Sequence, residues 1–171
     1  FYGFNDFLLA TGYKSNVLKK FFENTKIKKS NIKLVYTGKD TLTGGRILRL
    51  RKLIKDEEFL MTYGDGLSNV NLKKLISFHR DSKSIVTLTA VRPPVRFGEI
   101  TLSSKGKISQ FKEKPQSSKN WINGGFFVMN KVIFDYIKND KTIFEKQPLE
   151  TLARNKKLSG YKHFSFWQCM D

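Results

Sequence analysis

Apolar runs alternate with amphipathic stretches through the first half of the chain. Strands are predicted for the short apolar runs at residues 7–10, 32–36 and 59–63, and for the β-branched run "SIVTLTAV" at 84–91. Between them, apolar residues recur at helical spacing, as at Leu72, Leu75, Ile76 and His79. This alternation of strands and helices predicts an α/β fold with a mostly parallel sheet, helices on both faces and residues 85–90 in a central strand.

Strands cluster in the second half of the chain. Residues 97–102 and 107–111 flank "SSKG", which has the composition of a hairpin turn, so we expect an antiparallel hairpin there. A further strand is predicted at "NGGFFVMN" and another near 160–163, with helices near 132–137 and 149–154. Because no repeat or low-complexity linker interrupts the chain, we interpret residues 1–171 as one domain.

The composition limits the class of protein and the environment in which it works. The chain has 171 residues, 39% of them hydrophobic, which is enough for a sizeable core. No apolar run approaches the length of a membrane span, no signal peptide is recognisable, and Cys169 is the only cysteine. We therefore expect no membrane association, no internal disulfide and a reducing, cytoplasmic environment.

The charge is strongly positive and raises a second interpretation. Lys and Arg number 32 against 15 Asp and Glu, a formal net charge of +17. Such a protein could bind nucleic acid, anionic lipid or phosphorylated small molecules. The lysines are scattered and form no long basic arm, so a solvated lysine-rich surface is favoured over a nucleic-acid face. Salt-dependent binding to generic DNA would support the nucleic-acid alternative.

Four clusters of polar residues fall where predicted strands begin or end. They are "YGDG" with Asp65, "RFGE" with Gly98, "FKEKP" with Glu113 and Lys114, and "INGG" with Asn123. In open α/β sheets, ligands bind outside the carboxyl ends of the strands, so these clusters indicate a site at one sheet edge. Each has a plainer explanation, namely a tight turn, a type I′ hairpin turn or a surface charge pair.

The stretch "TLTGGR" opens a predicted helix with Thr43, Gly44 and Gly45. N–H groups exposed at a helix start can bind an anion or a base edge, although an ordinary capped helix would have the same sequence. The chain has no Walker-type loop, no HExxH motif and no Cys/His spacing typical of a metal site. His79 and His163 are therefore interpreted as packing or surface residues.

Several stretches occur together in one order from end to end of the chain. They are "ATGYK", "TGGR", "TYGDG", "TLTA" with "PPVRFG", "FKEKP", "INGGFFV", "EKQPLETLA" and "FWQCMD". In this order they resemble the sugar-nucleotide nucleotidyltransferases, in particular the branch that uses CTP and glucose 1-phosphate. The resemblance implies a three-layer Rossmann-like fold, a homo-oligomer at full length, and transfer of a cytidylyl group from CTP to α-D-glucose 1-phosphate. The products would be CDP-glucose and pyrophosphate.

The resemblance also implies roles for individual residues. Asp65 and Asp171 match the carboxylates that bind magnesium, and Lys114 matches the lysine that contacts the sugar phosphate, so Asp65 and Lys114 would be the catalytic residues. The residues that match the nucleotide side are Thr11, Gly12, Tyr13, Thr43, Gly44, Gly45 and Gly64. Those that match the sugar side, besides Lys114, are Gly98, Glu113, Asn123 and Gly124. A relative that uses another nucleotide or sugar phosphate is the alternative within this class.

The chain departs from the family pattern in three places. The family's glycine-rich signature loop, which holds the triphosphate, would precede Phe1, and both ends look cut from a longer protein. We therefore expect little transferase activity from these 171 residues alone, and a purely structural role for an incomplete chain is a further alternative. Cys169 stands where the family pattern has proline, and Glu99 where a small residue is common.

Lys114 gives a first testable prediction. In a protein completed with the glycine-rich loop, Lys114→Ala should lower kcat/KM for the sugar phosphate about tenfold to a hundredfold, because a charge-assisted contact contributes roughly 1.5–3 kcal/mol. CTP binding measured without the sugar should barely change. An equal loss for CTP would place Lys114 on the nucleotide side, and no loss would make it a surface partner of Glu113.

Overall fold

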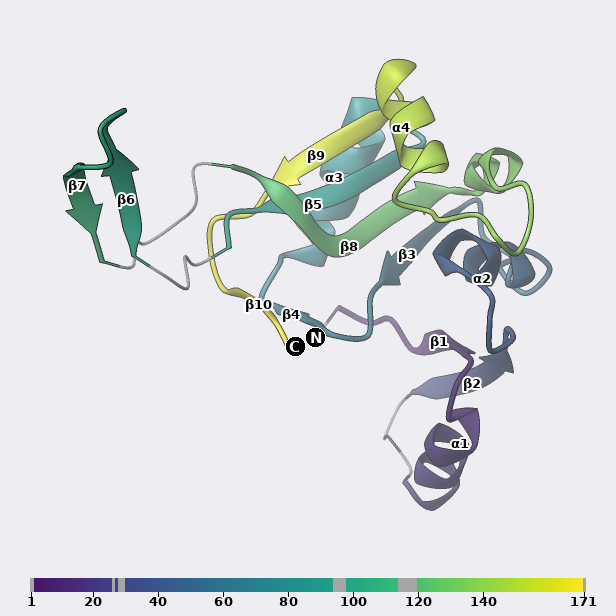
Figure 1. The fold of residues 1–171 in the computed structure, drawn as a ribbon. Helices are drawn as coiled ribbons and strands as arrows, with labels where there is room; N and C mark the ends of the chain where they lie inside the picture. Colours follow the sequence, from purple (N-terminus) through teal and green to yellow (C-terminus); the bar gives the residue numbers. More distant parts are fainter. Residues whose placement is uncertain (1, 26, 28–29, 94–97, 114–119, 171) are drawn as a thin grey trace.

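A four-stranded mixed sheet forms the centre of the molecule (Figure 1). The computed structural model describes residues 2–25, 27, 30–93, 98–113 and 120–170. The strand order in the sheet is β3 (Glu58–Thr62), β8 (Ile122–Asn130), β5 (Val86–Val91), β9 (Leu158–Lys162). Strand β8 runs antiparallel to both of its neighbours, and β5 and β9 are parallel. The predicted α/β fold is confirmed, with β5 in the interior of the sheet.

Three strand pairs accompany this sheet. Strands β1 (Asp6–Thr11) and β2 (Asn31–Tyr36) are parallel, while β4 (Gly66–Ser68) and β10 (Trp167–Cys169) are antiparallel. The predicted hairpin is confirmed as β6 (Glu99–Leu102) and β7 (Ile108–Lys112). Sequence reasoning missed β4 and β10, because three residues are too few to show a period.

The helices are short and lie where the apolar spacing predicts them. They are α1 (Ser15–Asn24), α2 (Thr43–Arg49), α3 (Leu72–Ser82), α4 (Gln147–Arg154) and a 3₁₀ helix, η1 (Lys131–Tyr136). Asn71 caps the start of α3, because its side chain accepts a hydrogen bond from the Lys74 N–H at 3.0 Å. Helix α2, which "TLTGGR" was predicted to open, ends at Arg49, and the chain continues beyond it as separate turns. Among the described residues, no helix combines the length and apolar character that crossing a membrane requires.

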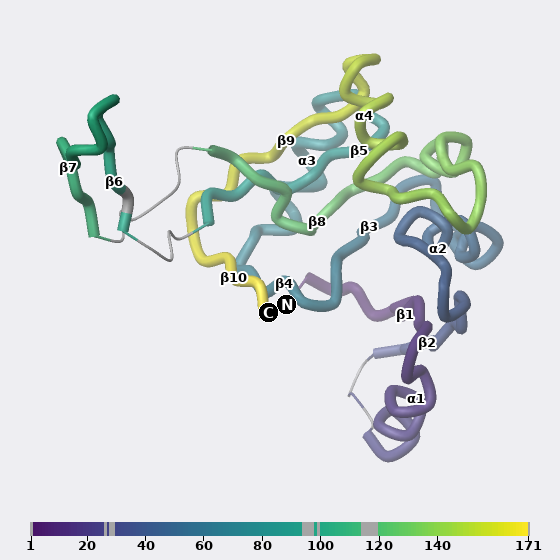
Figure 2. The backbone as a smooth tube through the Cα atoms, in the orientation of Figure 1, coloured from purple at the N-terminus to yellow at the C-terminus, as the bar shows by residue number. Residues whose placement is uncertain are grey.

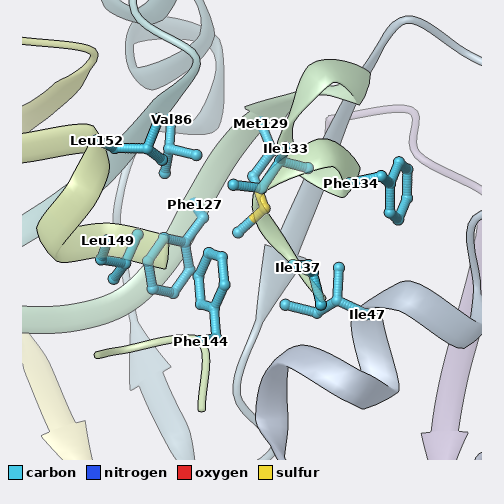
Figure 3. Packing of buried hydrophobic residues seen from close by; sticks show 10 residues of the cluster. All are labelled: Ile47, Val86, Phe127, Met129, Ile133, Phe134, Ile137, Phe144, Leu149 and Leu152. Carbon is cyan, nitrogen blue, oxygen red and sulfur yellow. The ribbon is translucent and has the colours of Figure 1, made fainter. Parts of the chain in front are cut away.

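Alternating residues of β5 and β8 face the two helical layers. Phe127 and Met129 of β8 join Val86 of β5 in an apolar core that α4, η1 and α2 complete (Figure 3). The rings of Phe127 and Phe144 meet edge to face there, with centroids 5.7 Å apart. Residues of opposite parity, such as Thr87, meet α3 on the other face. Figure 1 shows α3 behind the sheet and α4 in front of it, as the predicted layers require.

The α3 face contains a buried polar group. His79 is 2% exposed, its Nδ1 lies 2.8 Å from the Thr87 hydroxyl, and its Nε2 lies 3.1 Å from Oδ1 of Asn130. The amide nitrogen of Asn130 donates to the Ser84 carbonyl, so Oδ1 is free to accept from His79. Nε2 therefore donates to Asn130, and Nδ1 shares the other hydrogen bond with the Thr87 hydroxyl. The interpretation of His79 as a packing residue agrees with this network.

His79 gives a stability prediction. Replacing it with Leu leaves the Thr87 hydroxyl and the Asn130 oxygen buried without their partner, and each such loss costs about 1–3 kcal/mol. We expect His79→Leu to lower the free energy of unfolding by about 2–4 kcal/mol, measured by urea denaturation. Lys74→Leu, on the exposed face of the same helix, is the control and should change it by less than about 0.5 kcal/mol. Equal stability of the two variants would contradict the proposed network.

Candidate functional site

Asp65 lies just beyond β3, at the turn into β4. It is exposed, and a Cβ placed on the preceding Gly64 would have no atom within 4 Å, so the space beside it is open. Its carbonyl accepts a hydrogen bond from the Met170 N–H at 2.9 Å, which extends the pairing of Cys169 with Gly66. The structure thus brings the chain that leads to Asp171 alongside Asp65 (Figure 2). Asp171 itself lies outside the described residues, as does Lys114.

The surroundings of Asp65 are compatible with a magnesium ion. Magnesium in proteins binds one or two carboxylates and completes its shell with water and phosphate oxygens. Asp65 offers an exposed carboxylate with open space beside it. Across the described part of the chain, no group of three or more His, Cys, Asp or Glu residues gathers into a site made of protein ligands alone. A magnesium ion here would therefore take most of its ligands from substrate and water.

Asn123 is held in one orientation at the start of β8. Its Nδ2 donates to the Tyr63 hydroxyl at 3.2 Å, and its Oδ1 accepts from the Gly125 N–H at 2.9 Å. Gly125 has φ +76, and a Cβ placed there would lie 2.6 Å from Cδ2 of Tyr63. The Tyr63 N–H also donates to the Gly125 carbonyl at 3.2 Å. Tyr63, Asn123 and Gly125 therefore form one packed unit directly before Gly64 and Asp65.

Gly124 is required by strand packing. A Cβ at this position would lie 2.8 Å from Cγ1 of Val91 and 2.9 Å from the Thr89 carbonyl on β5. The Gly124 carbonyl accepts from the indole Nε1 of Trp167 at 2.8 Å, which connects β10 to β8. A side chain here would push β8 away from β5. The proposed contact between Gly124 and a sugar stays a prediction.

Glu145 joins this unit to the start of α2. The Tyr63 hydroxyl donates to its Oε1 at 2.6 Å, and the Thr43 hydroxyl donates to its Oε2 at 2.6 Å. The Thr43 oxygen also accepts from the Phe144 N–H at 2.9 Å. Burial, reinforced by the hydrogen bond and the negative charge of Glu145, raises the pKa of Tyr63 well above its ordinary value of about 10. Tyr63 therefore stays protonated and acts as a donor to Glu145.

Gly44 and Gly45 allow α2 to approach another part of the chain. A Cβ on Gly45 would lie 2.5 Å from the Asp140 carbonyl oxygen, and one on Gly44 would lie 2.8 Å from the Thr142 carbonyl oxygen. The Gly44 N–H donates to that Thr142 carbonyl at 2.9 Å. The start of α2 has no side-chain cap among the described residues, and close packing against Asp140 and Thr142 accounts for both glycines. Their nucleotide role stays a prediction.

Thr11, Gly12 and Tyr13 lie at the carboxyl end of β1. The Thr11 carbonyl accepts from Nη1 of Arg46 at 3.1 Å, and a Cβ on Gly12 would lie 2.5 Å from Nη2 of the same guanidinium. Gly12 is therefore needed to admit Arg46. Tyr13 is 69% exposed, with the Lys14 ammonium 5.4 Å from its ring centroid. The placement of Tyr13 beside the nucleotide, which the resemblance implies, stays a prediction.

The remaining sugar-side residues lie on the hairpin. A Cβ on Gly98 would be 3.0 Å from Oε2 of Glu113, so these two residues are neighbours. The β6–β7 hairpin stands apart from the four-stranded sheet in Figure 1. Gly98 and Glu113 therefore lie side by side next to the two hairpin strands, and a shared site with Asn123 stays a prediction.

Sequence reasoning missed Tyr63 and Glu145, the two residues whose hydrogen bonds connect Asn123 to the start of α2. Glu145 is 82 positions from Tyr63 and 102 from Thr43, so no local pattern links them. It also missed a cationic cluster near the start of β8, where Arg92 and Lys162 lie 4.6 and 5.7 Å from the Trp121 ring centroid.

Two surface hollows lie elsewhere on the molecule. One is lined by Lys73, Ile76, Ser77, Arg80 and Asp81, and the other by Arg51, Lys52, Ile54, Lys55 and Lys131. Neither includes a predicted site residue, so the candidate site rests on the strand-end residues and not on a hollow.

Known proteins resemble this chain over nearly its whole length. The profile of the family described as Nucleotidyl transferase matches residues 2–168. Glucose-1-phosphate cytidylyltransferase from Salmonella typhi is 38% identical over 99% of this chain and 74% of its own length. D-glycero-alpha-D-manno-heptose 1-phosphate guanylyltransferase from Aneurinibacillus thermoaerophilus is 31% identical over 93% of this chain and 70% of its own.

A solved structure has the same fold. The crystal structure of HddC from Yersinia pseudotuberculosis superposes with a TM-score of 0.75 at 20% identity. The superposition covers 98% of this chain and 74% of HddC. The likeness extends the fold to a protein of distant sequence and supports the α/β architecture described above.

The contact between Gly125 and Tyr63 gives a prediction with a matched control. Gly125 and Gly106 have similar φ values, +76 and +74, but only Gly125 would place a Cβ against another residue. Both Gly→Ala variants pay about 1–2 kcal/mol for left-handed backbone. We expect Gly125→Ala to lower the free energy of unfolding by at least about 1 kcal/mol more than Gly106→Ala, because the Tyr63 ring must move. Equal losses in urea denaturation would show that Tyr63 is not held by this contact.

Proposed function

Because the chain belongs to the nucleotidyl transferase family, we propose that it transfers a cytidylyl group from CTP to α-D-glucose 1-phosphate, giving CDP-glucose and pyrophosphate. The observation that carries this proposal is the likeness of almost the whole chain to the Salmonella typhi glucose-1-phosphate cytidylyltransferase. The guanylyltransferase relative is less similar and supplies the alternative, a different nucleotide with a different sugar phosphate.

The reaction is a displacement at phosphorus. A phosphate oxygen of glucose 1-phosphate forms a bond to the α-phosphorus of CTP, and the bond from that phosphorus to the bridging oxygen breaks. Pyrophosphate leaves with the electron pair of the broken bond. Both reactants are anions, so the protein must position them and offset their repulsion without a nucleophile of its own. The net charge of +17 attracts both substrates to the protein.

Asp65 is assigned to the magnesium ion, with Asp171 as the second carboxylate. The exposure of Asp65 and the pairing of Met170 with its carbonyl support this assignment. When bound, magnesium neutralises phosphate charge and orients the triphosphate. Lys114 is assigned to the phosphate of the sugar as a point charge.

The two substrates are assigned to different elements. Asn123 and Gly124 at the start of β8, with Gly98 and Glu113 on the hairpin, are assigned to the sugar. Amide and carboxylate groups suit hydroxyls, which both donate and accept hydrogen bonds. The nucleotide is assigned to Thr11, Gly12 and Tyr13 after β1, to Thr43–Gly45 and to Gly64. The exposed Tyr13 ring, with its lysine neighbour, supports this side.

Selectivity for one substrate pair tests the proposed function. Calorimetric binding of CDP-glucose and GDP-mannose to the 171-residue chain with Mg²⁺ is measured first, since binding depends less than turnover on the upstream loop. We expect CDP-glucose to bind at least about tenfold more tightly, a difference of about 1.4 kcal/mol that one well-placed hydrogen bond can supply. Tighter binding of GDP-mannose would move the chain to the guanylyltransferase branch.

Pyrophosphate release is then measured with CTP and glucose 1-phosphate in the protein completed with the glycine-rich loop, because turnover is expected to depend on that loop. Replacing CTP by GTP, or glucose 1-phosphate by mannose 1-phosphate, should reduce the rate. Asp65→Asn tests the metal assignment and should remove the Mg²⁺-dependent part of the rate. The fold should stay intact, because this carboxylate is exposed. An unchanged rate in Asp65→Asn would overturn the metal assignment.

A further inference from the structure

We propose that Glu145 is a positioning residue for the transfer reaction, because its carboxylate fixes, through Tyr63, the orientation in which the Asn123 amide meets the sugar. The inference rests on the proposed function, since it assigns Asn123 to the sugar. The family stretch "EKQPLETLA" begins with Glu145, but the role proposed here follows from the hydrogen bonds that converge on its carboxylate.

The direction of each hydrogen bond follows from the chemistry of the carboxylate. An ionised carboxylate only accepts, so the Tyr63 and Thr43 hydroxyls, each 2.6 Å from one of its oxygens, must both donate. Tyr63 has a single proton and gives it to Glu145. Toward Asn123 it can then only accept, and the group that lies 3.2 Å away is the amide nitrogen.

A second contact requires the same orientation. The Asn123 oxygen accepts from the Gly125 N–H at 2.9 Å. A flipped amide would place its nitrogen against that N–H and its oxygen against a Tyr63 oxygen that has no proton to give. Both ends of the amide are therefore fixed before any ligand binds.

The fixed amide keeps binding capacity for a ligand. An amide has two N–H donors and two lone pairs on its oxygen, and the contacts with Tyr63 and Gly125 use one of each. Among the described residues, no other group uses the second donor and the second acceptor of the amide, and the positions of both are fixed. A sugar hydroxyl can both donate and accept, so it complements this pair, and no conformational entropy is lost in turning the amide.

The charge of Glu145 distinguishes this role from simple packing. Within the described ranges, Glu145 makes no ion pair, although the chain carries 32 Lys and Arg residues. Its partners are neutral hydroxyls, and a half-buried carboxylate without a cation is costly. Glutamine could fill the same space, but it can donate as well as accept and would no longer force Tyr63 to point its proton away from Asn123.

The Thr43 oxygen should keep its position in such a variant. It accepts from the Phe144 N–H at 2.9 Å, a contact that does not involve Glu145. The effect of removing the charge should therefore fall on the sugar side of the site and spare the nucleotide side.

The test compares Glu145→Gln with Glu150→Gln in the protein completed with the glycine-rich loop, so that CTP binding can be measured. Glu150 is exposed on α4, and its substitution removes the same charge. We expect Glu145→Gln to raise the Kd for glucose 1-phosphate about tenfold and to change the Kd for CTP less than about twofold, both measured by calorimetry. Glu150→Gln should change neither.

Two further readouts separate positioning from structural support. Tyr63→Phe should raise the Kd for glucose 1-phosphate by a similar factor. The double variant should raise this Kd little further, because both changes break the same chain of hydrogen bonds from Glu145 through Tyr63 to Asn123. Alkaline titration followed by ultraviolet absorbance, with Tyr63→Phe identifying the signal, should show a lower Tyr63 pKa in Glu145→Gln.

Each outcome bears on a different claim. If the wild-type protein completed with the loop binds neither glucose 1-phosphate nor CTP, the proposed function is wrong and the inference falls with it. If the wild type binds both and Glu145→Gln weakens them equally, or weakens neither, the inference alone is overturned. A lower melting temperature with both Kd values unchanged would make Glu145 a structural residue.

Discussion

The antiparallel pairing of β8 with both β3 and β5 is the constraint on which the fold and the site depend. Its register with β3 sets Thr62 opposite Phe126, which brings Tyr63 to Gly125 at the strand end. The same register turns Phe127 and Met129 toward the apolar core and leaves Asn130 to pair with His79. A shift of one residue would exchange the two faces of the strand. Core packing therefore also holds Asn123 in position.

Helix α2 connects this sheet with the separate β1–β2 pair. Arg46 donates to the Thr11 carbonyl and, at 2.8 Å, to the Thr37 hydroxyl, so its guanidinium joins the ends of both strands. On the same helix, Thr43 contacts Glu145, and Arg49 makes a two-point contact with the Asp140 carboxylate, which lowers the pKa of that carboxyl. A short helix without ideal caps is held in place mainly by these contacts with distant residues.

Local patterns were sufficient to predict most strands and helices, because hydrophobic periodicity and turn-forming residues can be recognised within a short stretch of consecutive residues. The β-branched run became β5, and "SSKG" became the hairpin turn, with Gly106 at φ +74. The glycines were harder to interpret. Sequence reasoning identified places where something approaches the backbone closely, yet at Gly12 and Gly45 the approaching atoms belong to Arg46 and Asp140. Only the fold shows which distant side chain fills such a space.

The site residues show the same limit. Asp65 could be predicted because its signal is local, a carboxylate between two glycines after an apolar run. The link between Tyr63 and Glu145 could not, because it spans 82 positions and depends on how α4 and β3 pack across the core. Neither residue type is unusual in its own stretch. A resemblance can point to the stretch that contains Glu145, but the direction of its hydrogen bonds appears only in three dimensions.

The carboxylates of Asp65 and Glu145 differ in how far protein groups cover their charge. Both substrates of the proposed reaction are anions, so any uncovered carboxylate repels them. Glu145 is half-buried and both of its oxygens are covered by the Tyr63 and Thr43 hydroxyls, which leaves little of its charge directed at a ligand. Asp65 is exposed and lies beside open space at Gly64. A bound cation would reverse the effect of Asp65 on a phosphate, whereas each oxygen of Glu145 already accepts a hydrogen bond from a protein hydroxyl. The structure therefore suits Asp65 to metal binding and Glu145 to holding protein groups in place.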